Sequence, residues 1–351
     1  MNSFGGRVPF GALPYVEACS IAMGTYTEKQ RNDSEEPMGK RDVGRDINGR
    51  SPLQRHFRRY WQLYLMMVVP VVYFIVFKYM PMIGNILAFR KYRPGKGIFG
   101  TEWVGFRYFK RFFEDPAFWR AFRNTLSLSL LNIVFTFPLP IVFAILLNEV
   151  NRKRFKKVVQ TISYMPRFIS TVVVIAMMTE ILSPSSGLFN QFRVNVLHLQ
   201  PVYYMNEPQY FRFLYIASGA WQFTGWTAII YLASITNINS DLYEAAEIDG
   251  AGRFQQIFHV TLPSILPTIM VMLILEVGRL LSLGFEKVLL MYTPSNSSVS
   301  DIIDTLVYRT GLTNQNYSYA TAIGLFSGII GLVLVSGSNK LSKLLTGDGI
   351  Y

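Results

Sequence analysis

The chain has 351 residues, of which 50% are hydrophobic and only 16% are charged, and its mean hydropathy is +0.25. Soluble domains contain about 25% charged residues, so this composition excludes an ordinary water-soluble protein. The single cysteine, Cys19, excludes a disulfide or a cysteine metal cluster within the chain, and the three histidines show no metal-ligand spacing. The net charge of +12 fits the basic cytoplasmic loops of a membrane protein better than a nucleic-acid surface.

Residues 1–50 are polar and contain no apolar block. This pattern predicts a disordered cytoplasmic tail and argues against a cleaved signal peptide. Met38, just before GKRDVGRD, is an alternative start of the native protein.

A helix that crosses a bilayer needs about 20 mostly apolar residues. Six stretches meet this requirement and predict an all-α membrane domain over residues 51–340. The expected spans are about 60–78, 124–147, 158–182, 213–236, 263–283 and 318–339. Residues 341–351 are expected to form a short cytoplasmic tail.

Lysine and arginine residues gather before the first span and in NRKRFKK, at 151–157. Basic loops stay in the cytoplasm, so this distribution places both termini there. The loop of about 79–123 must then face outward although it is also basic. Long loops weigh less in this rule, and the predicted orientation is kept.

The loop 238–262 separates the fourth and fifth spans. It contains most of the stretch EAAEIDGAGRFQQIFHVTLPSILP, which runs from Glu244 to Pro267. Asp241 followed three residues later by Glu244 is typical of a helix start. Ala245 and Ala246 favour a helix and let another surface approach closely, and Gly250 suits a left-handed helix end. The loop therefore predicts a short surface helix that docks on another protein.

This loop resembles the EAA signature of permease subunits in bacterial ATP-binding-cassette (ABC) importers: EAA, three residues, Gly, nine residues, Ile-x-Leu-Pro. The only departure is Val260 in place of Ile. The stretches SYMPRFIS, SLGFEKVLLMY and YSYATAIGLF are similar to the polysaccharide and oligosaccharide permease group of the maltose-type carbohydrate branch. The resemblance covers residue 50 to the C-terminus and implies the type I importer permease fold, with six transmembrane helices and a cytoplasmic coupling helix.

The resemblance also implies partners and roles. The expected partners are a cytoplasmic ATPase dimer, a second homologous permease, an extracytoplasmic solute-binding protein, an oligosaccharide substrate and the lipid of the bacterial inner membrane, but no nucleic acid. The sequence has no GxxxxGK[ST] segment, so ATP and Mg²⁺ are expected on the ATPase subunits, and no catalytic residue, cofactor or metal is expected in this chain. The residues expected to contact the ATPase are Glu244, Ala245, Ala246, Asp249, Gly250, Leu262 and Pro263.

Charged and polar residues within the spans are candidates for the substrate pathway, because such groups are costly in a membrane. Glu276 and Arg279 are three residues apart, so they are expected to share a helix face and to form a pair. They would contact a charged ligand, or the pair would pin the helix to the partner permease. Arg167, Gln222 and Trp226 are further candidates. For the aromatic residues of the fourth span, interfacial anchoring is the competing interpretation.

Arg90, Lys91, Arg93 and Arg107 would form a positive field at the outer entrance. They would attract an anionic substrate, such as an alginate or rhamnogalacturonan fragment, or dock an acidic solute-binding protein. The leading hypothesis is therefore an ABC-importer permease for an oligosaccharide. The alternative function is an ion-coupled secondary sugar transporter, for which the sequence lacks the expected inverted repeats.

Overall fold

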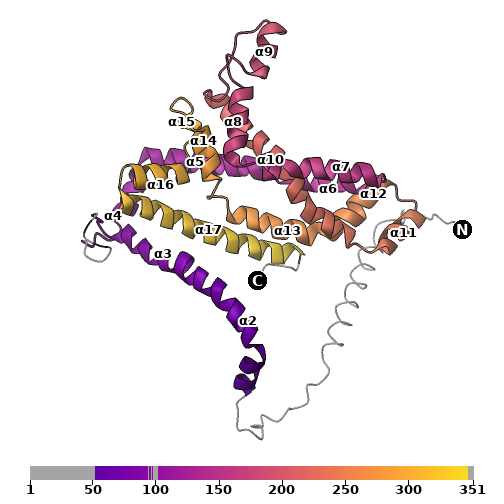
Figure 1. Cartoon of the computed structure of the whole chain (residues 1–351), viewed down its shortest axis with the longest axis horizontal. Helices are drawn as coiled ribbons and strands as arrows, with labels where there is room; N and C mark the ends of the chain where they lie inside the picture. The colour runs from indigo at the N-terminus through magenta and orange to yellow at the C-terminus, as the bar shows by residue number, and fades with distance from the viewer. Residues whose placement is uncertain (1–51, 94, 96, 98–101, 347–351) are drawn as a thin grey trace, which may run out of the picture. The chain divides into compact units, whose positions relative to one another are not determined.

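The computed structural model describes residues 52–93, 95, 97 and 102–346, and most of them are helical (Figure 1). The predicted tail at 1–50 and the last residues, 347–351, lie outside this part of the chain. Within it the only β pairing is an isolated bridge between Arg90 and Trp103. The all-α fold class is thus confirmed. The chain divides into two units, residues 1–78 and 79–351, which are described separately.

The first unit contains helix α2 (Pro52–Phe74) and most of the π-helical turn η1 (Ile75–Tyr79). The backbone of α2 is non-helical at Tyr60 (φ −118°, ψ 19°), where the apolar part of the helix begins. A continuous helical run, Tyr60–Phe89, is long and apolar enough to cross a membrane, and none of its most apolar window is buried in protein. Such a surface is stable only in contact with lipid or a partner protein.

The second unit consists of helices joined by short loops. Its elements are α3 (Met80–Met82), η2 (Ile83–Phe89), α4 (Arg107–Glu114), α5 (Pro116–Leu131), η3 (Asn132–Thr136), α6 (Pro138–Asn148), α7 (Lys153–Tyr164), η4 (Met165–Phe168), α8 (Thr171–Ile181), α9 (Leu188–Asn195), α10 (Pro208–Thr236), α11 (Ser240–Ile248), α12 (Arg253–Gln256), η5 (Ile257–Thr261), α13 (Leu262–Gly278), α14 (Phe285–Met291), α15 (Ser297–Ser300), α16 (Ile303–Tyr308), η6 (Arg309–Thr313) and α17 (Tyr317–Thr346).

The long helices of this unit pack side by side, α10 against α6 and α13 against α17 (Figure 1). Helices α11 and α12 lie at one end of the bundle, and α4 and α16 lie at the other. Three clusters of buried apolar side chains form the core, and one of them joins α6, α10 and α13 around the fully buried Tyr231. The two ends of the bundle are therefore formed by different helices and are joined by a packed interior.

Four helical runs of the described chain pass a length and apolarity test for membrane spans: Tyr60–Phe89, Pro116–Asn148, Arg253–Gly278 and Tyr317–Leu344. A bent pair of helices counts as a fifth. Helix α10 has 29 residues, enough to span, but its Gly, Ser, Gln, Trp and Tyr residues leave it less apolar than these four. The exact number of six spans stays a prediction.

The third predicted span, 158–182, is not a single helix. Helix α7 and turn η4 end at Phe168, and α8 leaves at an angle of 98°. Pro166 supplies no backbone N–H, Ile169 is extended, and the Ser170 hydroxyl caps α8 by accepting from the Val173 N–H. The apolar content of the stretch predicted a span, but these local signals bend it.

The fifth predicted span, 263–283, also has different ends. The helix begins at Arg253, continues through the π-helical turn η5 and ends at Gly278. Pro263 cannot donate a hydrogen bond to the preceding turn, and the wider turn before it accommodates the missing bond, with the Leu262 N–H donating to the Ile257 carbonyl. The second half of the predicted loop 238–262 is therefore continuous with the spanning helix.

Candidate functional site

Helix α11 carries the acidic motif of the loop between α10 and α13. The Asn239 side chain caps it by accepting from the Asp241 N–H at 3.1 Å, so the helix begins at Ser240, just before the Asp241 start that the sequence suggested. Glu244 and Ala245 are exposed and Ala246 is half-buried. The motif thus forms one turn of a surface helix with small side chains next to a carboxylate.

The C-terminus of α11 is a Schellman motif centred on Gly250. Asp249 is the C-cap, the Gly250 N–H donates to the Glu247 carbonyl at 3.0 Å, and the Ala251 N–H donates to the Ala246 carbonyl at 2.8 Å. Gly250 has φ +80°, and a Cβ built on it would touch nothing within 4 Å. Its glycine is therefore required by backbone conformation and not by space.

Helix α11 is tied to the base of α13. The Tyr243 and Thr261 hydroxyls are 2.9 Å apart, with Thr261 buried, and the Gln256 side-chain amide donates to the Ala251 carbonyl at 3.1 Å. Leu262 and Pro263 follow directly as the first residues of α13. Helix α11 is thus connected to a spanning helix by hydrogen bonds and a continuous backbone.

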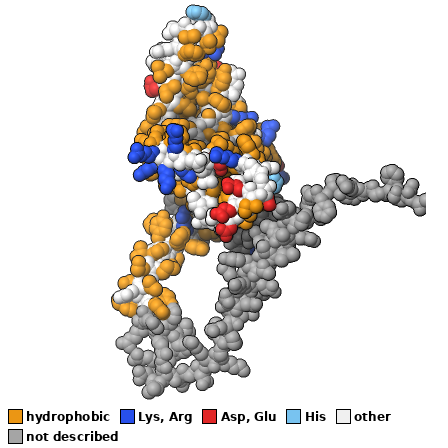
Figure 2. Space-filling view, turned by 90° about the vertical axis from the view of Figure 1, so that its right-hand side faces the viewer, with side chains coloured by type: hydrophobic (Ala, Val, Ile, Leu, Met, Phe, Trp, Pro, Cys, Tyr) orange, Lys and Arg blue, Asp and Glu red, His pale blue; other side chains and the backbone are white. Residues whose placement is uncertain are grey.

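The outer surface of this region has an apolar centre with carboxylates around it. Ile248 is 87% exposed and Phe254 is 79% exposed. The exposed carboxylates of the helix and its cap are those of Asp241, Glu244, Glu247 and Asp249. Figure 2 looks onto this end of the bundle, where acidic and basic side chains form separate neighbouring groups. Exposed apolar side chains with a charged rim are the usual composition of a docking surface.

A cavity of about 450 Å³ lies between α6, α10, α13 and α14. Four charged residues line it, Glu276 and Arg279 at the end of α13, and Glu286 and Lys287 on α14. No ion pair forms among these four described residues, although all of them border the same space. The expected Glu276–Arg279 pair is absent because α13 ends at Gly278, and Arg279 does not continue its helical face.

Two of these charges are held by the cavity wall. The Glu276 carboxylate accepts from the Asn132 amide at 2.7 Å. Lys287 is buried, its ammonium donates to the Tyr215 carbonyl at 2.7 Å, and it lies 4.4 Å from the centre of the Tyr215 ring. One hydrogen bond leaves the ammonium with two further donors. Desolvation by burial lowers the pKa of Lys287 to about 7.

Polar atoms of the wall also lack partners. The Gln222 carbonyl oxygen and the hydroxyls of Thr136, Thr224 and Tyr231 are buried without a hydrogen bond, and all four residues line the cavity. Buried polar groups are normally satisfied, because an unmade hydrogen bond costs about 1–3 kcal/mol. Together with the unpaired charges, these atoms suit a ligand that carries both hydroxyl groups and charge.

The five candidate pathway residues separate into two groups. Gln222, Glu276 and Arg279 line the cavity, whereas Arg167 and Trp226 do not. The Arg167 guanidinium lies over the Phe223 ring at 5.1 Å, and Trp226 packs edge-on against Phe168 at 5.8 Å. Sequence reasoning missed Asn132, Glu286 and Lys287, and it considered Tyr215 only as one of the aromatic residues of the fourth span. Lys287 was not among the predicted pathway residues, because it follows the predicted span. It lies within the SLGFEKVLLMY stretch, which was noted only for family resemblance.

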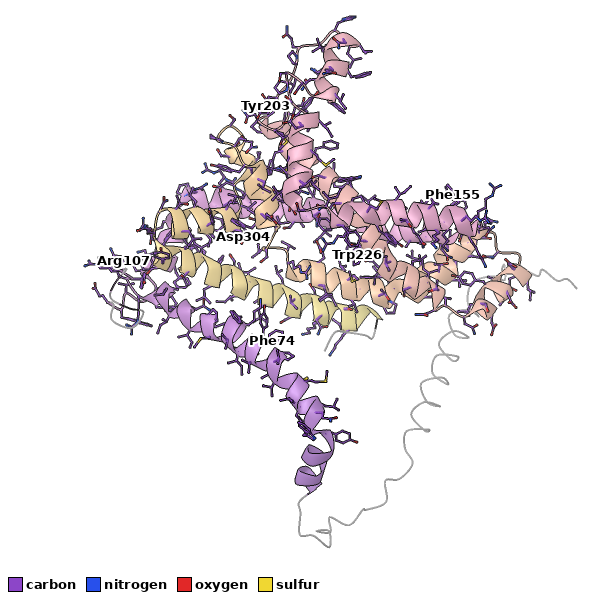
Figure 3. All side chains as sticks on the ribbon, viewed as in Figure 1. Phe74, Arg107, Phe155, Tyr203, Trp226 and Asp304 are labelled. Atoms are coloured by element: carbon purple, nitrogen blue, oxygen red, sulfur yellow. The ribbon has the colours of Figure 1, made fainter. Side chains whose placement is uncertain are left out.

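The basic residues proposed for the entrance do not line the cavity. The Arg90 guanidinium lies 5.7 Å from the Trp103 ring, and the Lys91 N–H donates to the Glu102 carbonyl at 2.9 Å. Arg93 is exposed, and Arg107 is the first residue of α4. Figure 3 places Arg107 at the opposite end of the bundle from Phe155, a neighbour of the basic residues that begin α7.

Comparison with known proteins finds components of transport systems. A family model described as the inner membrane component of binding-protein-dependent transport systems matches residues 138–345. The polygalacturonan/rhamnogalacturonan transport system permease protein YteP of Bacillus subtilis (strain 168) is 46% identical over 82% of this chain and 90% of its own. Protein LplB of the same organism is 42% identical over 82% and 91%. A chain in the crystal structure of a bacterial alginate ABC transporter, in complex with an alginate pentasaccharide-bound periplasmic protein, is 41% identical with a TM-score of 0.78 and covers 85% of this chain and 99% of its own.

The helical fold, the exposed helix α11 and the polar cavity fit a multi-pass transport permease. The chain belongs to the family of inner membrane components of binding-protein-dependent transport systems. The predicted class, a permease subunit of an ABC importer of the carbohydrate type, is confirmed, as is its assignment as a non-enzymatic subunit whose ATPase is a separate chain. This membership argues against the alternative of an ion-coupled secondary transporter. The roles of individual residues stay predictions.

Proposed function

We propose that this permease forms part of the import pathway for an anionic oligosaccharide that contains uronate units. The observation that supports this most directly is the cavity, which is lined by two cationic residues and by four residues that each carry a buried, unpartnered polar atom. Two relatives point to the same substrate class, because one is named for polygalacturonan and rhamnogalacturonan and another belongs to an alginate transporter.

The chemistry of the wall suits such a ligand. Lys287 and Arg279 would donate charge-assisted hydrogen bonds to a uronate carboxylate. Glu276, Glu286 and the Gln222 carbonyl oxygen would accept from sugar hydroxyls, and the threonine and tyrosine hydroxyls can donate or accept. Arg90, Lys91, Arg93 and Arg107, at the far end of the bundle from α11, would attract the anion or contact a solute-binding protein.

Transport would be driven from the opposite end. A cytoplasmic ATPase dimer that binds ATP and Mg²⁺ would hold α11 through its apolar centre and acidic rim, and a charge-assisted contact with Glu244 would resist sliding. Its motion would pass through Tyr243, Thr261 and the continuous helix to the cavity wall. We place α11 and both termini in the cytoplasm, and we expect a second permease and a solute-binding protein to complete the assembly.

The test uses the complete transporter in proteoliposomes, with its ATPase, partner permease and solute-binding protein. Uptake of trigalacturonate and of maltotriose, which have the same number of sugar units, is measured side by side. We expect preference for trigalacturonate, and a loss of about tenfold or more of that uptake in Lys287→Gln, because a charged hydrogen bond is removed. Glu286→Gln is the matched control, since it removes a charge of opposite sign from the adjacent position.

Two results would contradict the proposal. One is equal or better uptake of maltotriose by the wild-type transporter. The other is an equal loss of trigalacturonate uptake in Lys287→Gln and Glu286→Gln, which would show that the cavity does not distinguish the sign of a charge.

A further inference from the structure

The bend between α7 and α8 is held by one face of α10. Four residues of that helix, Gln222, Phe223, Gly225 and Trp226, contact the bend, and we call them the hinge clasp. The Gln222 side-chain amide donates to the Ile169 carbonyl at 2.8 Å. One turn further along, α10 approaches α7 so closely that a Cβ on Gly225 would overlap the Ser163 carbonyl oxygen.

The two aromatic members of the hinge clasp contact the residues between these points. The Phe223 ring lies under the Arg167 guanidinium, and Trp226 packs against Phe168. Arg167 and Trp226, both predicted from the sequence to contact substrate, thus belong to the support of the bend. Two residues of the hinge clasp, Gln222 and Phe223, also line the cavity, whereas Gly225 and Trp226 do not.

The two ends of the Gln222 amide have different surroundings. Its nitrogen satisfies the Ile169 carbonyl, which the break in the helix leaves without its usual N–H partner. Its oxygen is buried without a partner, and the residue lines the cavity at 2% exposure. The reverse amide orientation would set two carbonyl oxygens against each other, so the Ile169 carbonyl fixes which end is available.

We propose that Gln222 is a positioning residue that links occupancy of the cavity to the geometry of the bend. A sugar hydroxyl that donates to the Gln222 oxygen polarises the amide and strengthens its N–H bond to Ile169. The occupied cavity then stabilises the 98° bend, and α7 connects that bend to the end of the bundle where α11 and α12 lie (Figure 1). This inference rests on the proposed import of a polyhydroxylated substrate and adds a route by which the substrate is sensed.

The first experiment separates binding from coupling. ATPase activity of the complete transporter is measured against the concentration of trigalacturonate-loaded solute-binding protein, with maltotriose in a parallel series. For Gln222→Met we expect maximal stimulation to decrease about three- to tenfold with little change in the half-saturating concentration, the effect of one lost hydrogen bond on the coupled step. Thr224→Val is the matched control, because it removes a hydroxyl of the cavity lining that makes no hydrogen bond to the bend, and it should change only the half-saturating concentration.

The second experiment measures the bend itself. Spin labels replace Phe155 on α7 and Met177 on α8 in a Cys19→Ser background, and their distance distribution is recorded in the complete transporter. We expect Gln222→Met and Gln222→Glu, which both lose the N–H donor, to broaden the distribution, and Thr224→Val to leave it unchanged. Saturating sugar should narrow the wild-type distribution.

The outcomes are distinguishable. If the wild type is stimulated by maltotriose instead of trigalacturonate, the anionic substrate is wrong while the Gln222 test proceeds with maltotriose. If Gln222→Met changes only half-saturation, or leaves the distance distribution as in the wild type, the positioning role is overturned. A wild-type complex that neither sugar stimulates overturns both proposals.

Discussion

At the scale of single residues, Lys287 is the least expected group of the permease. An ammonium is buried only at a cost, and here one carbonyl and one aromatic face compensate for part of that cost. Gly219 makes room for it, since a Cβ there would lie 3.2 Å from the ammonium nitrogen. The charged groups that share its cavity are Glu276, Arg279 and Glu286. Such a cation is poised to change its charge near neutral pH.

Uptake of an anionic sugar should therefore depend on pH. Because burial lowers the pKa of Lys287 to about 7, the residue is cationic below that pH and becomes neutral as the pH rises through it. We expect uptake of trigalacturonate to decrease between roughly pH 6 and pH 8. Lys287→Arg keeps its charge throughout this range and should remove the slope. Persistence of the same slope in Lys287→Arg would assign the titration to another group.

Gly250 provides a second test at this scale. Its φ of +80° is unfavourable for alanine, so Gly250→Ala should destabilise the end of α11 by about 1 kcal/mol and weaken association with the ATPase. Asparagine tolerates this conformation, so Gly250→Asn should retain more association. Gly252→Ala is the control, because Gly252 has φ −70°. Co-purification of the ATPase with each variant is the measurement, and equal loss in both alanine variants would contradict the role of backbone conformation.

At the scale of elements, α10 and α7 cross closely next to the bend of the third span. Small residues allow helix backbones to approach in a membrane, and Gly225 is the position where this approach is tightest against backbone atoms of α7. The hydrogen bond from Gln222 and the contact at Gly225 are three residues apart and act on the same face of α10. One turn of α10 therefore contacts both the end of α7 and the bend.

Gly225→Ala should disturb this crossing. The added Cβ would meet the Ser163 carbonyl, and backbone atoms cannot yield as a flexible side chain can, so overpacking should cost about 1–3 kcal/mol. Gly324→Ala on α17 is the matched control, because a Cβ there meets nothing within 4 Å and alanine favours a helix. Thermal unfolding of the two purified variants is compared with the wild type. Equal midpoints for both would show that the crossing relaxes without cost.

At the scale of the whole molecule, apolar runs and the acidic motif were sufficient to predict the class, the helical fold and the short surface helix α11. Pro166 indicated a kink in the third span, but the full 98° break at Ile169 was not predicted, because hydropathy averages over Pro166 and Ser170, which decide it locally. Lys287 was not predicted because a search confined to spans omits a short helix beside them. The missing Glu276–Arg279 pair follows from the end of α13 at Gly278, which no periodic pattern marks. What sequence reasoning lacked in each case was the place where a helix stops.

The cavity wall contains as many carboxylates as cations, and this balance has a consequence for the dwell time of the cargo. A lining of cations alone would trap an acidic sugar, whereas neighbouring carboxylates repel it and limit its residence. A conduit must admit its solute and also let it go. The mixed lining therefore favours turnover over retention, and it leaves tight capture to a protein outside the membrane.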